Sequence, residues 1–278
     1  MKKLKVFAVL AAMGLAVSCY SEKIPKGFVK IPAASIDGTE TWTPIAPVLG
    51  GKHEIASFYM SDHPVIRGEF KAVVGFDPST YFYEKNVKNA PVINVDLRLA
   101  LLYCNLRSDM ENLTPCYLFD GKIAPDKDWR HAEIVTYNNT ANGYRLPTDV
   151  EWEWAARGGE SYKYAGSDDI DEVGCFIYEK VKSKKANGYG LYDMCGELWE
   201  RCLDEKDWTS SVKERPRESL DDCLRGGVWY IDRNGARVKE DVSILFAEPL
   251  YADVGDIDLV MDKISKRYWG FRVVRNAN

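Results

Sequence analysis

The sequence predicts a loop-rich α+β fold in which short antiparallel strands are combined with two main helices. Two segments have the pattern of longer helices, residues 94–112 and the segment that begins at 149. The other apolar runs are short, as expected of strands. Long irregular connections separate them and cluster in the second half of the chain. Such connections in a compact domain often carry function.

In the first half of the chain the sequence predicts two strands followed by two helices. Strands are expected at FVKIPA (28–33) and EIASFYMS (54–61), and a short helix at GEFKAVVG (68–75). Residues 94–112 form the strongest predicted helix. In this helix four apolar side chains recur at positions i, i+3, i+4 and i+7, and an asparagine precedes them as a candidate N-cap. These residues are Leu97, Ala100, Leu101 and Cys104, with Asn94 as the cap.

A strand at HAEIVTYN (131–138) precedes the stretch GYRLPTDVEWEWAARGG (143–159). Thr148 and Glu151 have the spacing of a capping box, which satisfies free backbone N–H groups at a helix start. Gly158 and Gly159 supply a helix stop, because glycine readily adopts the left-handed conformation.

The same stretch places apolar side chains along one side of its helix: Val150 and Trp154, with Trp152, Ala155 and Ala156 broadening that side. A structural role therefore explains the stretch better than catalysis by Glu151 or Glu153, which have no partner in sequence. Buried positions are expected for four tryptophans: Trp152, Trp154, Trp199 and Trp269. A last strand is expected in YWGFRVV (268–274).

Composition excludes one class of partner. The chain of 278 residues has a net charge of −5 and no basic tract, which argues against nucleic-acid binding. Its 16 tyrosines and 8 tryptophans are many, and aromatic side chains at this density suit a loop-rich fold or a ligand-binding surface.

The N-terminus has the pattern of an export signal. MKKLK is positively charged, and the following apolar run is too short to span a membrane as a helix. The run ends at Ser18-Cys19 in the manner of a bacterial lipoprotein signal, although an ordinary secretory signal remains the alternative. We therefore expect residues 1–18 to be a signal peptide and Cys19 to carry the lipid anchor. The mature protein is then exported and tethered to the bacterial envelope, at the outer membrane or the cell surface.

The other cysteines and the histidines show no metal-binding spacing. Six further cysteines can pair in many ways in an exported protein, and buried thiols are an equally good interpretation. None of them has the spacing of a zinc ribbon. The three histidines are scattered through the first half of the chain. No catalytic triad or phosphate-binding loop is evident.

Four motifs occur in an order that resembles a known family. They are GYRLPTDVEWEWAARGG (143–159), NGYGLYDMCGELWE (187–200), LRGGVW (224–229) and WGFRV (269–273). The order resembles the formylglycine-generating-enzyme-like, or sulfatase-modifying-factor, domain, which has an elaborated C-type lectin fold. The resemblance extends over about the whole mature chain and implies a single domain over residues 19–278.

The resemblance implies the fold but argues against the family's activity. The active enzymes use two cysteines shortly after the glycine pair to build a copper–thiolate site. Here Ile231 stands about where the first of these cysteines is expected, and the last cysteine of the chain, Cys223, precedes the motif. A second enzymatic branch holds iron through histidines, and no bunched histidine pattern is present here. We therefore expect no enzymatic activity and no cofactor.

Calcium is the one inorganic ligand that the resemblance leaves open. Family members bind it near the motif that aligns with GELWE, and Glu197 and Glu200 offer the oxygen ligands that calcium prefers. Glu197, however, replaces the usual asparagine. A structural strand with solvated carboxylates is the favoured interpretation.

The same fold is used without catalysis in the variable proteins of diversity-generating retroelements, including a treponemal one. They vary surface residues between RGG-W and GFR motifs, and many are lipoproteins. Adenine-directed mutation of asparagine codons excludes Lys, Glu, Gln, Met and Trp, and none of these occurs in residues 230–237 or 250–260. The second segment also lacks the period of a buried element.

The sequence thus predicts a non-catalytic surface lipoprotein that binds an unknown protein or glycan ligand. The expected contact residues are Tyr230, Ile231, Asp232, Asn234, Tyr251, Asp253, Asp256 and Asp258. The alternative is a residual enzyme, or an envelope-assembly lipoprotein of the gliding or secretion type, with the same fold.

Overall fold

The computed structural model describes residues 24–37, 52–81, 87–123, 132–175, 180–203, 214–216, 222–231, 237–240, 248–249 and 268–277. The predicted signal peptide and Cys19 lie outside the described residues. Among the helices in these ranges, none combines the length and the apolar character needed to cross a membrane.

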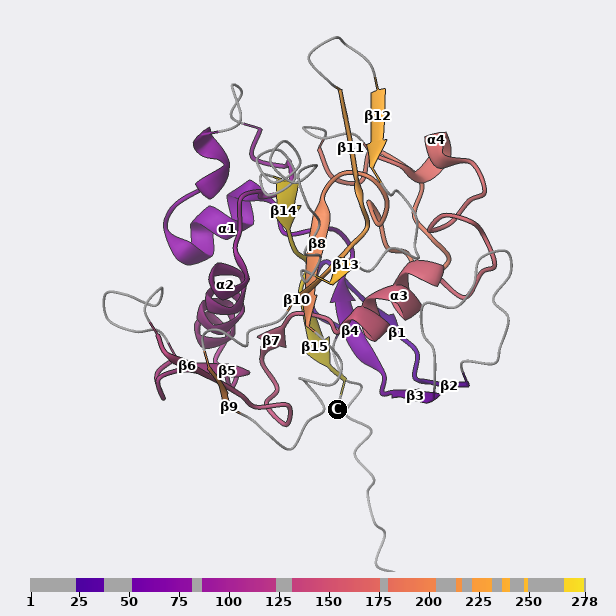
Figure 1. The fold of residues 1–278 in the computed structure, drawn as a ribbon. Coiled ribbons are helices and arrows are strands. Elements are labelled where there is room, and N and C mark those ends of the chain that lie inside the picture. Colours follow the sequence, from indigo (N-terminus) through magenta and orange to yellow (C-terminus); the bar gives the residue numbers. More distant parts are fainter. Residues whose placement is uncertain are drawn as a thin grey trace, which may run out of the picture.

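A four-stranded sheet lies at the centre of the fold (Figure 1), in the order β1-β4-β15-β7. Its strands are β1 (Phe28–Ile31), β4 (Phe58–Ser61), β7 (Tyr144–Arg145) and β15 (Val274–Asn276). Strand β15 is antiparallel to both neighbours, and Val274 lies opposite Met60 on one side and Arg145 on the other. The last strand of the chain is therefore an interior strand of the sheet.

Both faces of this sheet are covered. Strand β4 is buried throughout, and its side chains alternate between two apolar clusters as the pleat requires. Tyr59 belongs to the cluster that includes residues of helix α2 (Leu97–Met110). Phe58 and Met60 belong to the cluster that includes residues of helix α3 (Asp149–Arg157). The two main helices thus lie on opposite sides of the central sheet (Figure 1).

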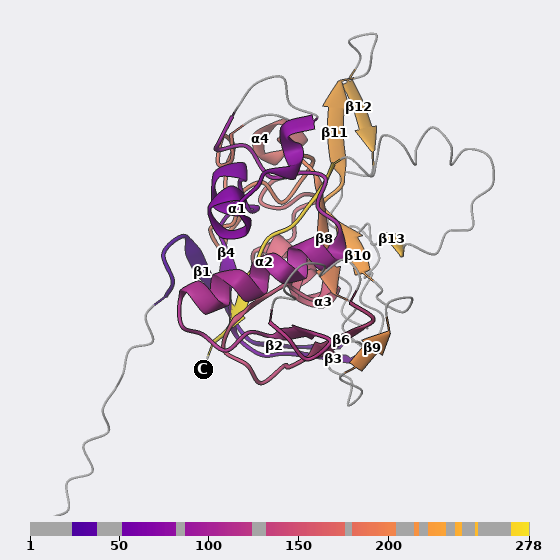
Figure 2. The same ribbon diagram turned by 90° about the vertical axis from the view of Figure 1, so that its left-hand side faces the viewer.

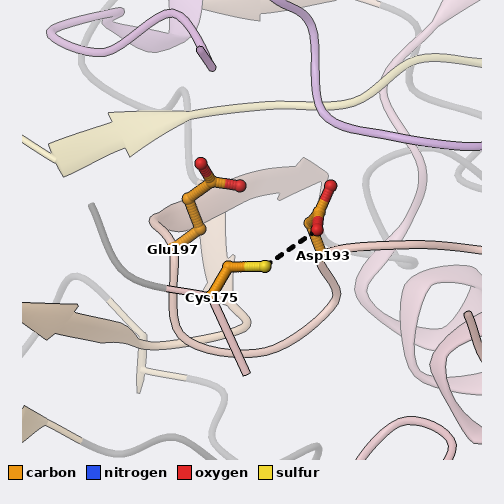
Figure 3. Close-up of side chains that lie close together, drawn as sticks. All are labelled: Cys175, Asp193 and Glu197. Carbon is orange, nitrogen blue, oxygen red and sulfur yellow. Dashed lines mark hydrogen bonds between the residues drawn. The ribbon is translucent and has the colours of Figure 1, made fainter. Parts of the chain in front are cut away.

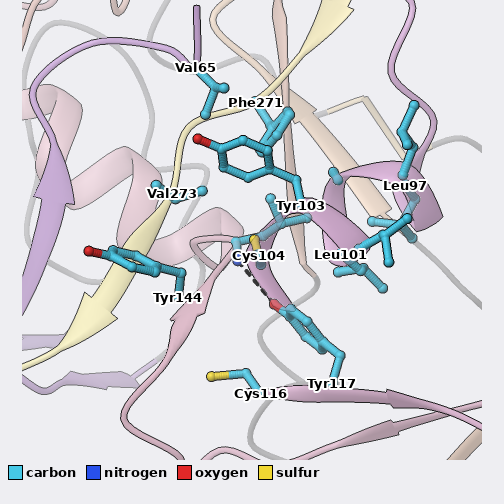
Figure 4. Close-up of a cluster of buried hydrophobic side chains, with 14 of the residues drawn as sticks. Val65, Leu97, Leu101, Tyr103, Cys104, Cys116, Tyr117, Tyr144, Phe271 and Val273 are labelled. Carbon is cyan, nitrogen blue, oxygen red and sulfur yellow. Dashed lines mark hydrogen bonds between the residues drawn. The ribbon is translucent and has the colours of Figure 1, made fainter. Parts of the chain in front are cut away.

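Helix α2 carries the larger of the two clusters (Figure 4). All four side chains that were predicted to face the core are buried, and Tyr103 is buried with them. The Tyr103 ring packs edge-on against Phe271, with ring centroids 5.2 Å apart. This contact attaches the helix to the C-terminal segment.

The start of α2 differs from the prediction. The side chain of Asp96, not Asn94, caps the helix by accepting a hydrogen bond from the Leu99 backbone N–H at 2.8 Å. Asn94 instead adopts a left-handed backbone conformation, with φ of 62°. Asparagine tolerates this conformation better than most residues, so it bends the chain into the helix without capping it.

The capping box of α3 is confirmed. The Thr148 hydroxyl accepts a hydrogen bond from the Glu151 N–H at 3.1 Å, and a Glu151 carboxylate oxygen accepts one from the Thr148 N–H at 2.9 Å. Gly158 ends the helix in the left-handed conformation. The capping box and the terminal glycine can be predicted from the sequence because each acts over only a few residues.

A second four-stranded sheet has the order β13-β10-β8-β14. Its strands are β8 (Trp199–Leu203), β10 (Asp222–Arg225), β13 (Glu248–Pro249) and β14 (Trp269–Gly270). Strand β14 pairs in parallel with β8, while β10 pairs antiparallel with β8. A hairpin of β11 (Val228–Ile231) and β12 (Arg237–Glu240) extends away from the body of the molecule (Figures 1 and 2).

Short peripheral elements complete the described fold. They are strands β2 (Ala34–Asp37), β3 (Lys52–Ile55), β5 (Tyr117–Phe119), β6 (Ile134–Tyr137) and β9 (Glu214–Pro216), helices α1 (Arg67–Val74) and α4 (Ile170–Val173), and the 3-10 turn η1 (Pro78–Tyr81). The strand expected over 54–61 is two strands, β3 and β4, because β3 forms a separate hairpin with β2. The strand expected over 268–274 is also divided, between β14 and β15.

The prediction of four buried tryptophans is only partly confirmed. Trp152 and Trp199 are buried, at 0% and 5% exposure, but Trp154 and Trp269 are only half-buried. The Trp154 indole N–H donates to the Pro32 carbonyl oxygen at 2.9 Å, at the periphery of the domain. Trp152 is therefore the core indole of α3.

Replacing the two tryptophans of α3 should have unequal effects. Trp152→Ala should lower the free energy of unfolding by about 3–5 kcal/mol, because it empties a fully buried site. Trp154→Ala should cost about 1 kcal/mol, because its indole is half-buried. Chemical denaturation of both variants measures the difference. Equal losses would show that the two indoles share one environment.

Candidate functional site

The carboxylate of Glu200 joins three of the sequence motifs. Arg272, from WGFRV, donates to both of its oxygens, each at 2.6 Å. The indole N–H of Trp152, from the helix α3, donates to the same carboxylate at 2.8 Å. All three side chains are buried. A bidentate guanidinium pair in a dry interior is strong and fixes the direction of both side chains.

Glu153 forms a second buried ion pair, which involves the arginine of the RGGVW motif. Its carboxylate lies 3.3 Å from Nη1 of Arg225 and 2.5 Å from Nη2 of Arg157. Asp149 lies 3.7 Å from Nη2 of Arg225. The Glu153 carboxylate is thus paired with two arginines. The Glu151 carboxylate accepts hydrogen bonds from Arg145 at 2.6 and 2.7 Å. Both carboxylates have structural partners, as expected from the sequence.

Two glycines let the motifs approach one another. Gly226 has a φ of 93°, and a Cβ atom there would lie 3.5 Å from the Trp152 ring and 3.3 Å from the Leu198 carbonyl oxygen. A Cβ atom on Gly270 would meet the Leu198 side chain at 2.1 Å and the Val92 carbonyl oxygen at 2.5 Å. No side chain fits at Gly270 without displacing backbone.

These contacts define a frame around the C-terminal segment. We use the term frame for Trp152, Glu153, Glu200, Arg225 and Arg272. The chain leaves the frame after Arg225 and returns to it through β14, whose Trp269 pairs in register with Trp199. We use the term excursion for residues 226–268, which lie between the buried ion pairs of Arg225 and Arg272.

The predicted contact residues all lie within this excursion. Tyr230 and Ile231 belong to strand β11 of the projecting hairpin. The other six, Asp232, Asn234, Tyr251, Asp253, Asp256 and Asp258, lie outside the described residues.

An aromatic cluster stands where the excursion returns. Trp199 and Leu224 pack with Tyr268 and Trp269, and the guanidinium of Arg201 lies 4.4 Å from the Trp269 ring centroid. Arg201 also donates to the Val95 carbonyl oxygen at 2.7 Å. Burial lowers the pKa of Arg201 to about 10, against the opposing effect of Asp96. A guanidinium over an aromatic face is a favourable contact.

A thiol and two carboxylates converge beside the frame (Figure 3). Cys175 follows helix α4, while Asp193 and Glu197 lie in the loop before β8. Their ligand atoms all lie within 4.8 Å of one another, and all three residues are buried. The Cys175 thiol donates to Asp193 Oδ1 at 2.9 Å. Burial and the two neighbouring carboxylates raise the pKa of Cys175, and burial raises the pKa of Asp193.

The structure places the two calcium candidates in different surroundings. The Glu200 carboxylate is bound by Arg272 and Trp152, whereas Glu197 lies beside Cys175 and Asp193. Sequence reasoning missed Cys175 and Asp193, because eighteen residues separate them and no local spacing joins them.

Five of the cysteines among the described residues are buried thiols: Cys104, Cys116, Cys175, Cys195 and Cys202. Burial raises the pKa of Cys116 to about 11 and that of Cys195 to about 12. Thiols in this state are poor nucleophiles at neutral pH. Cys104, Cys116 and Cys195 behave as packing residues and not as reactive groups.

A cavity of about 380 Å³ lies beside Arg145, between β4 and the start of α3. The guanidinium there is already engaged, because its five N–H groups point to Glu151, Asn276 and the Leu146 carbonyl oxygen. Its charge serves the fold and not an anionic ligand.

Comparison with known proteins identifies the family to which the chain is similar. The model of the sulfatase-modifying factor enzyme 1-like domain matches residues 23–277. The chain is 33% identical over 214 residues to the chaperone protein LppX of Paenibacillus barcinonensis, covering 66% of this chain and 73% of that protein.

Two further relatives are similar over shorter regions. The formylglycine-generating enzyme of Streptomyces coelicolor is 37% identical over 117 residues, which cover 31% of this chain and 36% of the enzyme. The inactive C-alpha-formylglycine-generating enzyme 2 of Mus musculus is 30% identical over 113 residues, which are 34% of each protein.

Among solved structures, variable protein 1 of Treponema denticola superposes with a TM-score of 0.60 at 24% identity. The superposition covers 90% of this chain and 95% of that one. The likeness confirms the expected C-type lectin fold, elaborated as in formylglycine-generating-enzyme-like domains.

Neutralising Glu200 should destabilise the fold. Glu200→Gln preserves shape but leaves the charge of Arg272 buried without its partner, so we expect a loss of about 3–5 kcal/mol in the free energy of unfolding. Glu172→Gln is the control, because Glu172 and its partner Lys185 are about half exposed. The control should change stability by less than about 0.5 kcal/mol. Similar urea midpoints for both variants would contradict the frame's role.

Proposed function

The chain belongs to the family of sulfatase-modifying factor enzyme 1-like domains, and from this premise we propose that it is a non-catalytic, lipid-anchored surface protein. It binds a protein or glycan ligand through residues 230–268, between its RGGVW and WGFR motifs, and this segment is diversified by a retroelement.

The observation that carries the proposal is the frame. Arg225 and Arg272, at the two ends of the excursion, are each held by a buried carboxylate. The central sheet, both main helices and the frame are built almost entirely from residues outside 226–268. A segment held in this way is free to change its surface residues while the core stays fixed, as binding loops do on other rigid scaffolds.

The composition of the excursion supports a binding role. Residues 230–237 and 250–260 combine tyrosine with small polar and acidic residues, a mixture that suits recognition surfaces. Neither segment contains a residue type that adenine-directed mutation of asparagine codons excludes. The fold is shared with a variable protein of Treponema denticola.

The missing cysteines support the non-catalytic part of the proposal. No cysteine follows Cys223, so the chain lacks the thiolates that copper(I) requires in this family. The purified protein should therefore leave a cysteine-containing sulfatase peptide unmodified, with or without copper. Mass spectrometry of the peptide is the measurement, and conversion of its cysteine to formylglycine would refute this part.

The anchor depends on Cys19, which ends the predicted signal peptide. Cys19→Ala should shift the protein from the membrane fraction to the soluble fraction, because no acyl chain is then attached. Labelling with a fatty-acid analogue should mark the parent protein and not the variant. Retention of the variant in membranes, together with an unlabelled parent, would exclude the lipid anchor.

The similarity to LppX favours a second candidate function. A protein named a chaperone shares 33% identity with this chain over 214 residues, and in this second candidate function the ligand is a client polypeptide of the envelope. The two candidate functions predict different genes beside the gene for this protein. A near-copy of the region that encodes residues 230–271, beside a reverse-transcriptase gene, supports the first. An operon with envelope-assembly genes supports the second.

The binding face can be separated from the core by mutation. The proposal places Tyr230, Asp232, Tyr251 and Asp256 on the surface, where substitutions usually cost within about 0.5 kcal/mol each. Replacing the four together by alanine should therefore change the melting temperature little. The same variant should lose binding on an array of host surface proteins and glycans to which the parent binds.

The control variant carries Asp109→Ala and Met110→Ala, at the exposed C-terminal end of α2. It should keep both stability and binding. Unfolding of the fourfold variant would place those residues in the core, and unchanged array binding would place the ligand elsewhere.

A further inference from the structure

The Cys175–Asp193–Glu197 cluster has the donor atoms of a metal site but not those of a calcium site. Calcium takes six to eight oxygen ligands, and the family resemblance implies calcium near this motif. Here one of the three converging groups is a thiol, and it occupies an oxygen of Asp193 through a hydrogen bond of 2.9 Å. Sulfur is a poor ligand for a hard cation and a good one for zinc and similar metals. The donor set therefore disagrees with calcium.

The spacing of the three groups suits a smaller, thiophilic ion. Zinc binds cysteine sulfur at about 2.3 Å and carboxylate oxygen at about 2.0–2.2 Å. Neighbouring ligand atoms of a tetrahedral site then lie about 3.3–3.6 Å apart, as follows from those bond lengths. The three ligand atoms here lie within 4.8 Å of one another. Side-chain rotations that move a ligand atom by about 1 Å are enough to bring the largest of these separations to the tetrahedral value.

The surroundings of the cluster provide supporting contacts. The Lys182 backbone N–H donates to Asp193 Oδ2 at 2.7 Å and holds this carboxylate in place. The Ser183 hydroxyl lies 3.6 Å from Cys175 Sγ, close enough to serve as a further neighbour of a bound ion. Such outer contacts orient metal ligands and tune affinity. In Figure 3 the thiol points toward Asp193, and the Glu197 carboxylate lies beside them.

The burial of the cluster is a separate reason to expect an ion. Cys175, Asp193 and Glu197 are 0%, 3% and 2% exposed, so three acidic groups share a site that water hardly reaches. The guanidinium of Arg272 reaches the Asp193 backbone carbonyl oxygen at 3.4 Å, but it is paired with both oxygens of Glu200. Like charges in a dry site repel one another. A divalent cation removes this repulsion, because it balances the charge of two carboxylates or of a thiolate and a carboxylate.

We propose that Cys175, Asp193 and Glu197 bind one zinc-type divalent ion, in place of calcium, beside the frame. Binding is not a redox step. The ion displaces the proton of the Cys175 thiol to solvent and forms a metal–sulfur bond, while the carboxylates bind through oxygen. A fourth position is left to Ser183 or water. The ion ties the segment after α4 to the loop that precedes β8.

The test uses the full chain, purified in detergent and stripped with a chelator. Zinc should bind with a stoichiometry of one per chain in competition with a chromophoric chelator, and calcium at the same concentration should not displace it. Cobalt should substitute and give a thiolate-to-metal charge-transfer band, which only a bound sulfur produces. The cobalt spectrum needs no variant, so it remains decisive if a substitution impairs folding.

Variants assign the ligands. Cys175→Ser should abolish the charge-transfer band and weaken zinc binding by about 100-fold or more, and Glu197→Gln should weaken binding by at least about 10-fold, by comparison with the effect of second-sphere changes. The control is Cys195→Ser, a buried cysteine near the cluster whose sulfur faces the Ala165 N–H. It should leave the band and the affinity unchanged. No zinc binding by the parent, no cobalt–thiolate band, preference for calcium, or a Cys175→Ser variant that binds like the parent would each overturn the proposal. None of these outcomes bears on ligand binding by residues 226–268.

Discussion

The whole structure depends on the ion pair between Glu200 and Arg272. The pair lies in a dry interior, where a lone carboxylate or guanidinium would be very costly. Each charge therefore requires the other, and the Trp152 indole completes the coordination of the carboxylate. Because Glu200 lies on β8, Arg272 just before β15 and Trp152 on α3, one contact fixes the relative positions of both sheets and a main helix. Buried ion pairs often add little net stability, but they select one arrangement over its competitors.

Backbone contacts reinforce this arrangement along the C-terminal segment. The carbonyl oxygens of Trp269, Phe271 and Val273 accept hydrogen bonds from Val95, Val65 and Ser61. Every second residue of the segment is thus bonded to an element from the first half of the chain. The side chains of Phe271 and Val273 enter the cluster of α2, while Val274 enters that of α3. The segment serves both cores, and among the described residues neither of these two clusters has a member from 226–268.

Local signals were predictable from the sequence, and contacts between distant segments were not. The capping box of Thr148 and Glu151 was foreseen because it is complete within four residues. The difference in burial between Trp152 and Trp154 was not predictable. It depends on their hydrogen bonds to Glu200 and to the Pro32 carbonyl oxygen, which lie far away in sequence. The Asp96 cap was missed because Asn94 has the same local preference and lies two residues earlier. Glu197 was a calcium candidate only because the family resemblance aligns its motif with a calcium-binding one, and no such alignment pointed to its neighbours Cys175 and Asp193.

The interior position of β15 has a consequence for how errors in this chain are removed. Strand β15 lies between β4 and β7, and it is encoded after the excursion. A frameshift or a stop codon anywhere in residues 226–268 therefore deletes Arg272 and an interior strand, leaving β4 and β7 with unpaired edges and two opened cores. Such a product cannot complete the central sheet or either core, and it is exposed to proteases. Completion of the central sheet thus depends on translation of the chain through to its last strand.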